Sequence, residues 1–410
     1  MKKVIISVFV LFVCVAIPAQ INKDSLWSVW KDTTQVDTNR LSAVIGIIEN
    51  LIYNNPDSAD KLCSEMISLS NDPSLMKYHL TGLKYKGMAL FFKGLNEKAL
   101  EIFEIGLKKA YNRKFKMEFL LSLANVYQQS GENELKALSY YEEIVDLINI
   151  NDTIKEEELI YRSRVIMNIG LIYMKMGNYS VALKNYQQCL NTLNKFNREK
   201  DIYTVYGNIG LIYKKLKKYD LALKYYHLAL GEKKKIQRLF ILDGICVLYL
   251  DINQNDSALY YAEKKYTLSK EIKNIEGEIK SLDRIGTILM QQKQYNKALE
   301  KLNFALKLNE KYNFINLFPD IYISIGMVLI QKKKYNKAKN YFNKAYKVSN
   351  NIGSLPSLQE SAKYLSIIHN ISKDYKSAYN YYTEHIKIRD SLNSVSNKKA
   401  VIEHQYQEEY

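Results

Sequence analysis

Histidines are the first side chains to consider for catalysis or metal binding, and the chain has five of them. None belongs to an HExxH pair, and the sequence contains neither a glycine-rich phosphate loop nor a GxSxG nucleophile turn. The carboxylates are scattered among helical charges, so no general acid and base pair stands out. We therefore predict that the chain is not an enzyme and binds no metal or cofactor. The histidines are His79, His227, His369, His385 and His404.

Cysteine is the other residue type that carries chemistry, and there are four. Cys63, Cys189 and Cys246 are too widely spaced for a disulfide framework, and no CxxC motif or His-Cys cluster indicates zinc. Each falls where a helix needs a small core residue, so we interpret these three as packing residues. The fourth, Cys14, lies in an N-terminal apolar run.

The N-terminus has the layout of a secretory signal peptide. Lys2 and Lys3 precede an apolar run, and small residues follow up to Ala19. We expect cleavage after Ala19, loss of residues 1–19, and a periplasmic or secreted protein. A lipoprotein acylated at Cys14 is the alternative. Nothing later in the sequence approaches the roughly eighteen apolar residues of a membrane span, so we expect no span in the mature chain.

A repeated stretch shows which elements must position any functional side chains. The sequence NIGLIYMKMGNYSVALKNYQQCL, which begins at Asn168, returns forty residues later as NIGLIYKKLKKYDLALKYYHLAL, with thirteen of twenty-three positions identical. Apolar residues keep helical spacing on both sides of Gly177 and Asn178, which predicts two amphipathic helices joined by a tight turn. One such hairpin leaves an apolar face exposed to water unless it stacks on a neighbour.

The repeated unit resembles the tetratricopeptide repeat, in which small and aromatic residues recur at fixed positions. The resemblance implies an all-α fold, a right-handed superhelical solenoid of about nine helix hairpins. One copy departs from the pattern, because Cys246 replaces the glycine and Lys265 stands where a small residue is expected. The alanine of the second helix traces the repeats through the chain, as Ala59, Ala99, Ala137, Ala182, Ala222, Ala258, Ala298, Ala338 and Ala378.

The same resemblance implies a binding surface. In the family, first-helix side chains line a concave groove that binds peptides, and an asparagine there can bond the peptide backbone. Asn168 and Asn208 match that position. Asparagine is a poor helix former, which favours a use for its amide, although duplication of the whole motif explains its recurrence equally well. The groove residues are Arg164, Asn168, Leu171, Asn208, Leu211, Arg284 and Met327.

The charge of the chain bears on its partners. The net charge is +16, and only eight of the 59 basic residues are arginines. Proteins that recognise nucleic acids usually concentrate arginine, which makes bidentate contacts to phosphate and guanine. Here lysine is spread through every repeat instead, so we expect no nucleic-acid partner. The positive balance favours a peptide or protein ligand with acidic groups.

These observations predict an exported, non-enzymatic scaffold that binds a peptide or protein on its concave face. The expected layout is an N-terminal segment at 20–40, the repeat array at 41–390, and a C-terminal capping or lead-in helix at 391–410. The alternative is the sensory input module of a bacterial signal-transduction regulator, whose transmembrane and output parts are absent from this sequence. The tail from Asp390 to Tyr410 resembles the helix that leads into the membrane in such regulators.

Overall fold

The computed structural model describes residues 23–409, apart from 131–132, 150–154 and 232–233. Within these residues every regular element is a helix, which confirms the predicted all-α class. Two short 3-10 helices, η1 (Pro73–Leu75) and η2 (Ile315–Leu317), accompany the α-helices. The α-helices are α1 (Lys23–Lys31), α2 (Asp37–Leu51), α3 (Pro56–Leu69), α4 (Met76–Phe92), α5 (Asn96–Lys109), α6 (Arg113–Ser130), α7 (Glu134–Asn149), α8 (Glu156–Lys175), α9 (Tyr179–Lys195), α10 (Glu199–Lys215), α11 (Tyr219–Ala229), α12 (Lys235–Asp251), α13 (Asn255–Glu271), α14 (Ile275–Gln291), α15 (Tyr295–Tyr312), α16 (Phe318–Gln331), α17 (Tyr335–Ile352), α18 (Leu355–Ile371) and α19 (Tyr375–Glu409).

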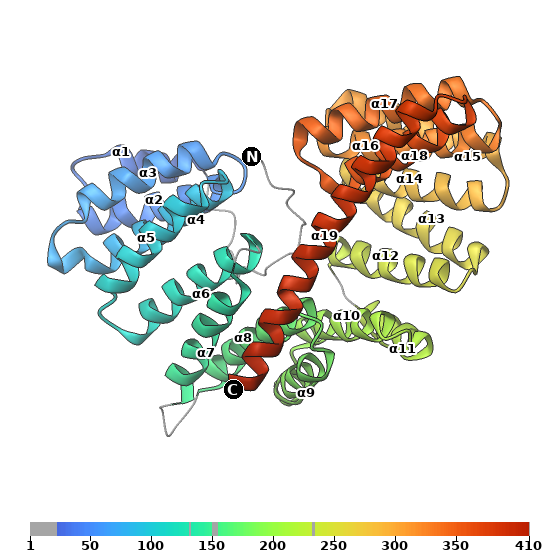
Figure 1. The fold of residues 1–410 in the computed structure, drawn as a ribbon. Helices are drawn as coiled ribbons and strands as arrows, with labels where there is room; N and C mark the ends of the chain where they lie inside the picture. Colours follow the sequence, from blue (N-terminus) through green and yellow to red (C-terminus); the bar gives the residue numbers. More distant parts are fainter. Residues whose placement is uncertain (1–22, 131–132, 150–154, 232–233, 410) are drawn as a thin grey trace. The chain divides into compact units, whose positions relative to one another are not determined.

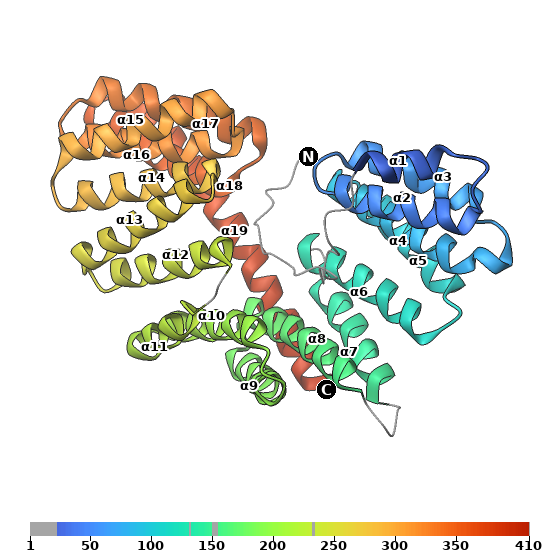
Figure 2. The same cartoon turned by 180° about the vertical axis from the view of Figure 1, so that it is seen from behind.

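In chain order, α2 to α19 form nine successive helix pairs among the described residues. The hairpin packing is plain for α14 with α15 and for α16 with α17, which lie side by side in Figures 1 and 2. The chain divides into two compact units. The first holds the described residues up to 173 together with 187–192, and the second holds 174–186 and the described residues from 193 onward. Each unit is considered by itself below.

The alanine series lies on the second helices, as the resemblance implies, and its members are buried. Every one of the nine alanines lies on the second helix of its pair. Eight have 0% of their surface exposed, and Ala378 in the last pair has 8%. Because these positions have no free space, the spacing of the alanines fixes which face of each second helix points inward.

Glycines on the first helices make room for large side chains on the second. A Cβ atom on Gly326 would lie 2.6 Å from the Phe342 ring, and the Tyr226 ring lies 2.9 Å from the position a Cβ would take on Gly210. In the atypical copy, Cys246 replaces the glycine, and Ala262 stands where most of the other pairs have a large residue. The volume is therefore conserved across the contact, since one side grows as the other shrinks.

The turns inside the hairpins end the first helix in a Schellman motif, although most lack glycine. At Lys333 the backbone φ is 56°, its N–H donates to the Ile330 carbonyl at 2.8 Å, and the next N–H donates to the Leu329 carbonyl at 2.9 Å. A left-handed φ is unfavourable for a residue with a Cβ. The same turn recurs, with φ between 56° and 61°, at Lys217, Lys293 and Lys373.

Helix starts follow the sequence signals. Asn55 caps α3 by accepting a hydrogen bond from the Ser58 N–H at 3.1 Å. Four prolines of the described residues lie at first turns, where a missing N–H costs nothing. They are Pro56 in α3, Pro73 in η1, Pro319 in α16 and Pro356 in α18.

The two ends of the array have structure of their own. The segment predicted at 20–40 contains α1, where Trp30 is 8% exposed and its carbonyl accepts a hydrogen bond from Arg40 Nε at 3.3 Å. At the other end, α19 continues through Asp390 to Glu409. The predicted signal peptide at 1–19, Cys14 included, and the side chains from 393 onward lie outside the described residues. None of the described helices combines the length and apolarity needed to cross a bilayer.

Replacing Ala222 by glutamate should destabilise the protein by about 3 kcal/mol or more, because it places a charge in a contact with no free space. The matched control is Lys224→Glu, on an exposed position of the same helix. Thermal unfolding followed by circular dichroism should show a large loss for Ala222→Glu and little change for the control. Equal melting temperatures would mean that α11 buries a different face.

Replacing Lys333 by glycine should stabilise the protein by roughly 0.5 to 1 kcal/mol, because glycine accepts the left-handed φ without strain. The control, Lys337→Gly, lies at an exposed position inside α17 and should destabilise by about 1 kcal/mol. Chemical denaturation of both variants checks this. Two changes of the same sign would contradict the assigned turn geometry.

Candidate functional site

The structure places all seven predicted groove residues on first helices, and all are half-buried. It does not bring them together in one unit. The first unit contains the three residues on α8, and the second contains the other four, on α10, α14 and α16. The predicted clamp of Asn168 with Asn208 therefore draws on both units, and its two asparagines are assessed separately.

Asn168 already has a partner inside the protein. Its Nδ2 donates to the hydroxyl of Tyr141 at 3.4 Å. That hydroxyl is fully buried and lies 2.6 Å from Asn125 Oδ1 and 2.9 Å from Gln128 Oε1. A hydroxyl donates one hydrogen, so it bonds one of these oxygens at a time and accepts from Asn168. Burial raises the pKa of Tyr141 well above its ordinary value, so the hydroxyl stays protonated and the network stays neutral.

Asn208 differs, because its half-buried side chain makes no hydrogen bond to another described residue. Leu211 lies one turn further along the same helix, and Met327 packs against the core of the C-terminal hairpins. Of the two predicted clamp residues, Asn208 is the one whose amide is available for a ligand.

The atypical Lys265 has an identified role. Its Nζ lies 2.7 Å from Asp243 Oδ1, across the contact between α13 and α12, and only 12% of the lysine side chain is exposed. Burial would raise the pKa of Asp243, but the charge and hydrogen bond of Lys265, with Arg284 and Lys214 nearby, outweigh that effect and lower it. The first-helix face of α12 thus carries a compensated charge.

The next two first helices carry charges that are not compensated in this way. Burial raises the pKa of Asp283 to about 6, and the charge of Asp320 adds to the effect, while a hydrogen bond from Ser324 and the charge of Arg284 oppose it. The Oδ1 atom of Asp283 is buried and accepts no hydrogen bond from a described residue. The pKa of Asp320 is also raised, chiefly by desolvation, although Ser357 Oγ donates to its Oδ1 at 3.0 Å.

The corresponding repeat positions in the first unit hold an ion pair instead of two carboxylates. Lys84 precedes Gly87 by three residues, as Asp283 precedes Gly286, and Glu118 precedes Ala124 by six, as Asp320 precedes Gly326. Lys84 Nζ and Glu118 Oε2 form an ion pair at 2.8 Å between α4 and α6. Between α14 and α16 both members of the pair are carboxylates.

Sequence reasoning selected Arg284 on this face but missed the acidic residues beside it. Asp243 and Asp283 are 40 residues apart and hold the same repeat position, which was the available signal. Asp320 had no such signal, because its relation to Asp283 depends on how α14 and α16 pack. We refer to Asp283, Asp320, Ser324 and Ser357 as the carboxylate subsite.

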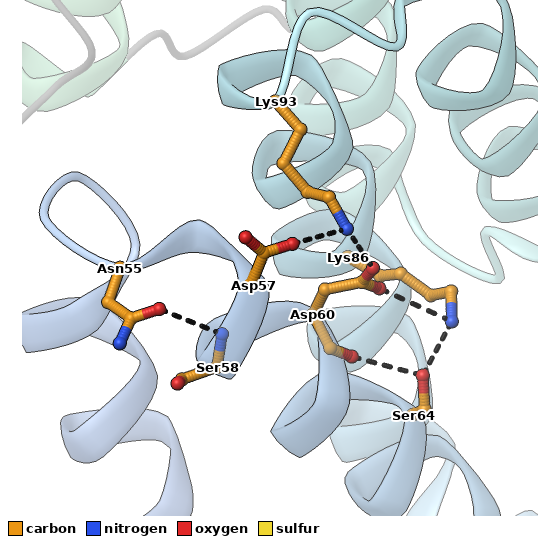
Figure 3. A network of polar contacts seen from close by, with 7 residues as sticks. All are labelled: Asn55, Asp57, Ser58, Asp60, Ser64, Lys86 and Lys93. Carbon is orange, nitrogen blue, oxygen red and sulfur yellow. Dashed lines mark hydrogen bonds and ion pairs between the residues drawn. The ribbon is translucent and has the colours of Figure 1, made fainter.

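A dense charge cluster elsewhere joins the hairpins of α3 and α4. Lys93 lies 2.9 Å from Asp57 and 3.1 Å from Asp60, and Lys86 lies 3.5 Å from Asp60 and 2.6 Å from Ser64; these contacts are drawn in Figure 3. These contacts join α3 to α4, so they fix two neighbouring hairpins. Every carboxylate in this cluster faces an ammonium group, unlike those of the carboxylate subsite.

The described residues offer no group of three or more His, Cys, Asp or Glu side chains that could hold a metal ion. The cysteines Cys63, Cys189 and Cys246 are free and buried, as predicted for packing residues. Burial raises the pKa of the Cys63 and Cys189 thiols to about 12 and that of Cys246 to about 11, so all three are protonated and unreactive near neutral pH.

Comparison with known proteins adds the family. A model of the tetratricopeptide repeat matches residues 161–231, and another matches 319–352. No curated protein sequence matches the chain.

Among solved structures, the apo form of the quorum sensor NprR from B. thuringiensis is similar with a TM-score of 0.59 and 14% identity, over 85% of this chain and 98% of that one. A Rap protein complexed with Competence and Sporulation Factor has a TM-score of 0.54 and 12% identity, over 87% and 99%. A Signal Transduction ATPase with Numerous Domains from Pyrococcus horikoshii, which has a tetratricopeptide repeat sensor, has a TM-score of 0.50 and 15% identity, over 92% and 60%.

At these identities the structural similarity concerns the fold alone. The 40-residue spacing and the buried alanines agree with it, and the two family matches identify tetratricopeptide repeats in this chain at residues 161–231 and 319–352.

Proposed function

We propose that this protein is a non-enzymatic scaffold that binds a peptide or protein segment on the first-helix face of α12, α14 and α16. The carboxylate subsite is the observation that supports this most directly. Two acidic side chains occupy a place where an ion pair joins α4 to α6, and a buried carboxylate oxygen has no partner among the described residues. A buried carboxylate oxygen without a hydrogen-bond partner, as in Asp283, costs stability, so a binding role is a reason for its presence, while Asp320 beside it is exposed to solvent.

The chemistry of the subsite defines what it would accept. An ionised carboxylate accepts hydrogen bonds and cannot donate them. The hydroxyl groups of Ser324 and Ser357 can do both. An ammonium or guanidinium group from the ligand would supply the positive charge that Lys84 supplies between α4 and α6. The ligand would therefore place a lysine, an arginine or its amino terminus here.

The remainder of the ligand would be acidic in balance. The net charge of +16 favours such a partner through long-range attraction. Arg284 is the predicted groove residue that would meet a ligand carboxylate, and its charge also acts on Asp243, Asp283 and Asp320. A peptide with one basic residue among acidic ones satisfies both preferences.

A sensory role is the alternative within the same binding function. The fold is similar to a quorum sensor and to a Rap protein solved with a bound factor, which supports recognition of a signal molecule by this architecture. In that case the bound segment would act as an input signal rather than as a partner held in a complex.

We also propose that the protein is exported, on the layout of residues 1–19. The binding partner would then be a periplasmic or extracellular peptide or protein. Lipidation at Cys14 is the alternative way of export.

Peptides selected from a displayed library on the purified protein at pH 7.5 should share a basic residue, and their affinity should fall at pH 5. The pKa of Asp283 is raised to about 6, so this carboxylate is charged above pH 6 and neutral below it, and attraction for a cation is lost as the pH falls. Calorimetry at both pH values checks this. The double variant Asp283→Asn with Asp320→Asn should weaken binding roughly tenfold to a hundredfold, as expected for a charge-assisted hydrogen bond.

Three further variants of the chain are compared with the double variant in the same binding measurement. Glu263→Gln, at an exposed site on α13, removes one charge from the same unit and should leave binding unchanged. Asn208→Ala tests the remaining clamp residue. Asn168→Ala serves as a stability control, because it breaks the bond to Tyr141. Peptides that bind the double variant as tightly as wild type would exclude the carboxylate subsite, and failure to select any peptide would argue against peptide binding itself.

Mass spectrometry of the protein purified from its native host should find Gln20 as the first residue, because a signal peptidase would cut after Ala19. An intact Met1 would contradict export by this route. An acylated Cys14 at the N-terminus would show the lipoprotein alternative.

A further inference from the structure

The second helix of each of the first eight hairpins has one residue whose side chain is almost completely buried. This residue lies four positions after the alanine of the series, and we call it the covered residue. In the first eight hairpins it is no more than 3% exposed. These residues are Cys63, Phe103, Tyr141, Tyr186, Tyr226, Ala262, Leu302 and Phe342.

The contacts within the second unit show how the cover is made. The Phe342 ring on α17 stacks on Tyr364 of α18, with ring centroids 4.9 Å apart. The Tyr226 ring on α11 lies 2.9 Å from the position a Cβ would take on Gly244 of α12. In each case the first helix of the next hairpin lies over the second helix of the previous one.

The ninth hairpin breaks this rule. The covered residue of α19 is Tyr382, and it is 54% exposed. Tyr375 and Tyr379, which are 65% and 67% exposed, lie on the same face of the helix at spacings of seven and three residues from Tyr382. No described helix covers this face, which we call the α19 tyrosine face (α19 is the red helix in Figure 1).

Helices in this protein join through aromatic pairs. Tyr346 on α17 meets Tyr381 on α19 edge to face at 5.6 Å. Tyr249 on α12 stacks on Tyr261 of α13, also at 5.6 Å. A helix that presents exposed tyrosines at helical spacing is therefore the occupant that matches this interface chemistry, and α19 of a second copy is such a helix.

We propose that two copies of this chain associate through their α19 tyrosine faces. The face that the array leaves uncovered on one copy would then be covered by the same face of the other. A two-fold axis between the two helices limits the assembly to a dimer. Each face is buried by the same face of the other copy, so no such surface is left for a third copy. The interaction continues the helix-on-helix packing of the described array with a helix from a second molecule.

Sedimentation equilibrium of the purified chain should show a reversible dimer at concentrations up to about 100 µM, the range in which a weak helix-to-helix contact is populated. The double variant Tyr379→Glu with Tyr382→Glu should weaken dimerisation by at least about tenfold, because it places carboxylates opposite each other in the contact. The variant Tyr379→Phe with Tyr382→Phe keeps the rings and should remain a dimer.

The control is Tyr260→Glu with Tyr312→Glu, two tyrosines on α13 and α15 that are 52% and 44% exposed. This variant should dimerise like wild type, and circular dichroism should show all variants folded. A monomeric wild-type protein over the whole concentration range would overturn the proposal, and would leave the face to a helix from another protein. A dimer that survives the glutamate pair on α19 would also overturn it.

Discussion

The ring of Tyr226 fills the space between two glycines, Gly210 of its own hairpin and Gly244 of the next one. This fit, repeated with other residues along the chain, holds one hairpin together and joins it to its neighbour. A large residue on one helix requires a small residue opposite it on the other helix. In the pair of Cys246 with Ala262 the first helix has the larger residue and the second helix the smaller one. Since both contacts of the repeat depend on this fit, the spacing of small and large residues decides the whole fold.

Charged groups are arranged around this packing under a different constraint. Where two helices bring polar side chains together, the chain mostly pairs opposite charges, as at Lys84 with Glu118 and at Lys265 with Asp243. The carboxylate subsite is an exception within the described residues, because Asp283 and Asp320 are like charges with raised pKa values. Functional sites are where proteins accept such costs, which connects this local imbalance to ligand binding.

The α19 tyrosine face reflects the same repeat physics at the end of the described array. A repeat protein buries one face of each hairpin only through its neighbour. The second helix of the ninth hairpin has the aromatic residue of the pattern, Tyr382, without the neighbour that would bury it. The two binding surfaces that we propose thus differ in origin: the one along the first helices consists of side chains that packing does not use, and the one on α19 consists of a face that no described helix covers.

The sequence by itself determined the helical class, the pairing of helices, the positions of the turns and the buried alanines. These features depend on helical periodicity and on the sizes of residues a few positions apart, so one sequence contains the information. The glycine-free turn at Lys217 lies 40 residues after Gly177, at the repeat spacing, although its left-handed backbone has no signal in the residue type.

The tertiary structure alone decided which polar side chains are used and which are available. Asn168 and Asn208 look alike in the sequence, but Asn168 bonds Tyr141, 27 residues earlier in the chain. Asp283 and Asp320 are far apart in the sequence, and the effect of the Asp320 charge on Asp283 depends on how α14 and α16 pack. The physical reason is that hydrogen bonds and charge effects depend on atomic distances across helices. Those distances are set by how each helix is rotated against the next, which periodicity does not specify.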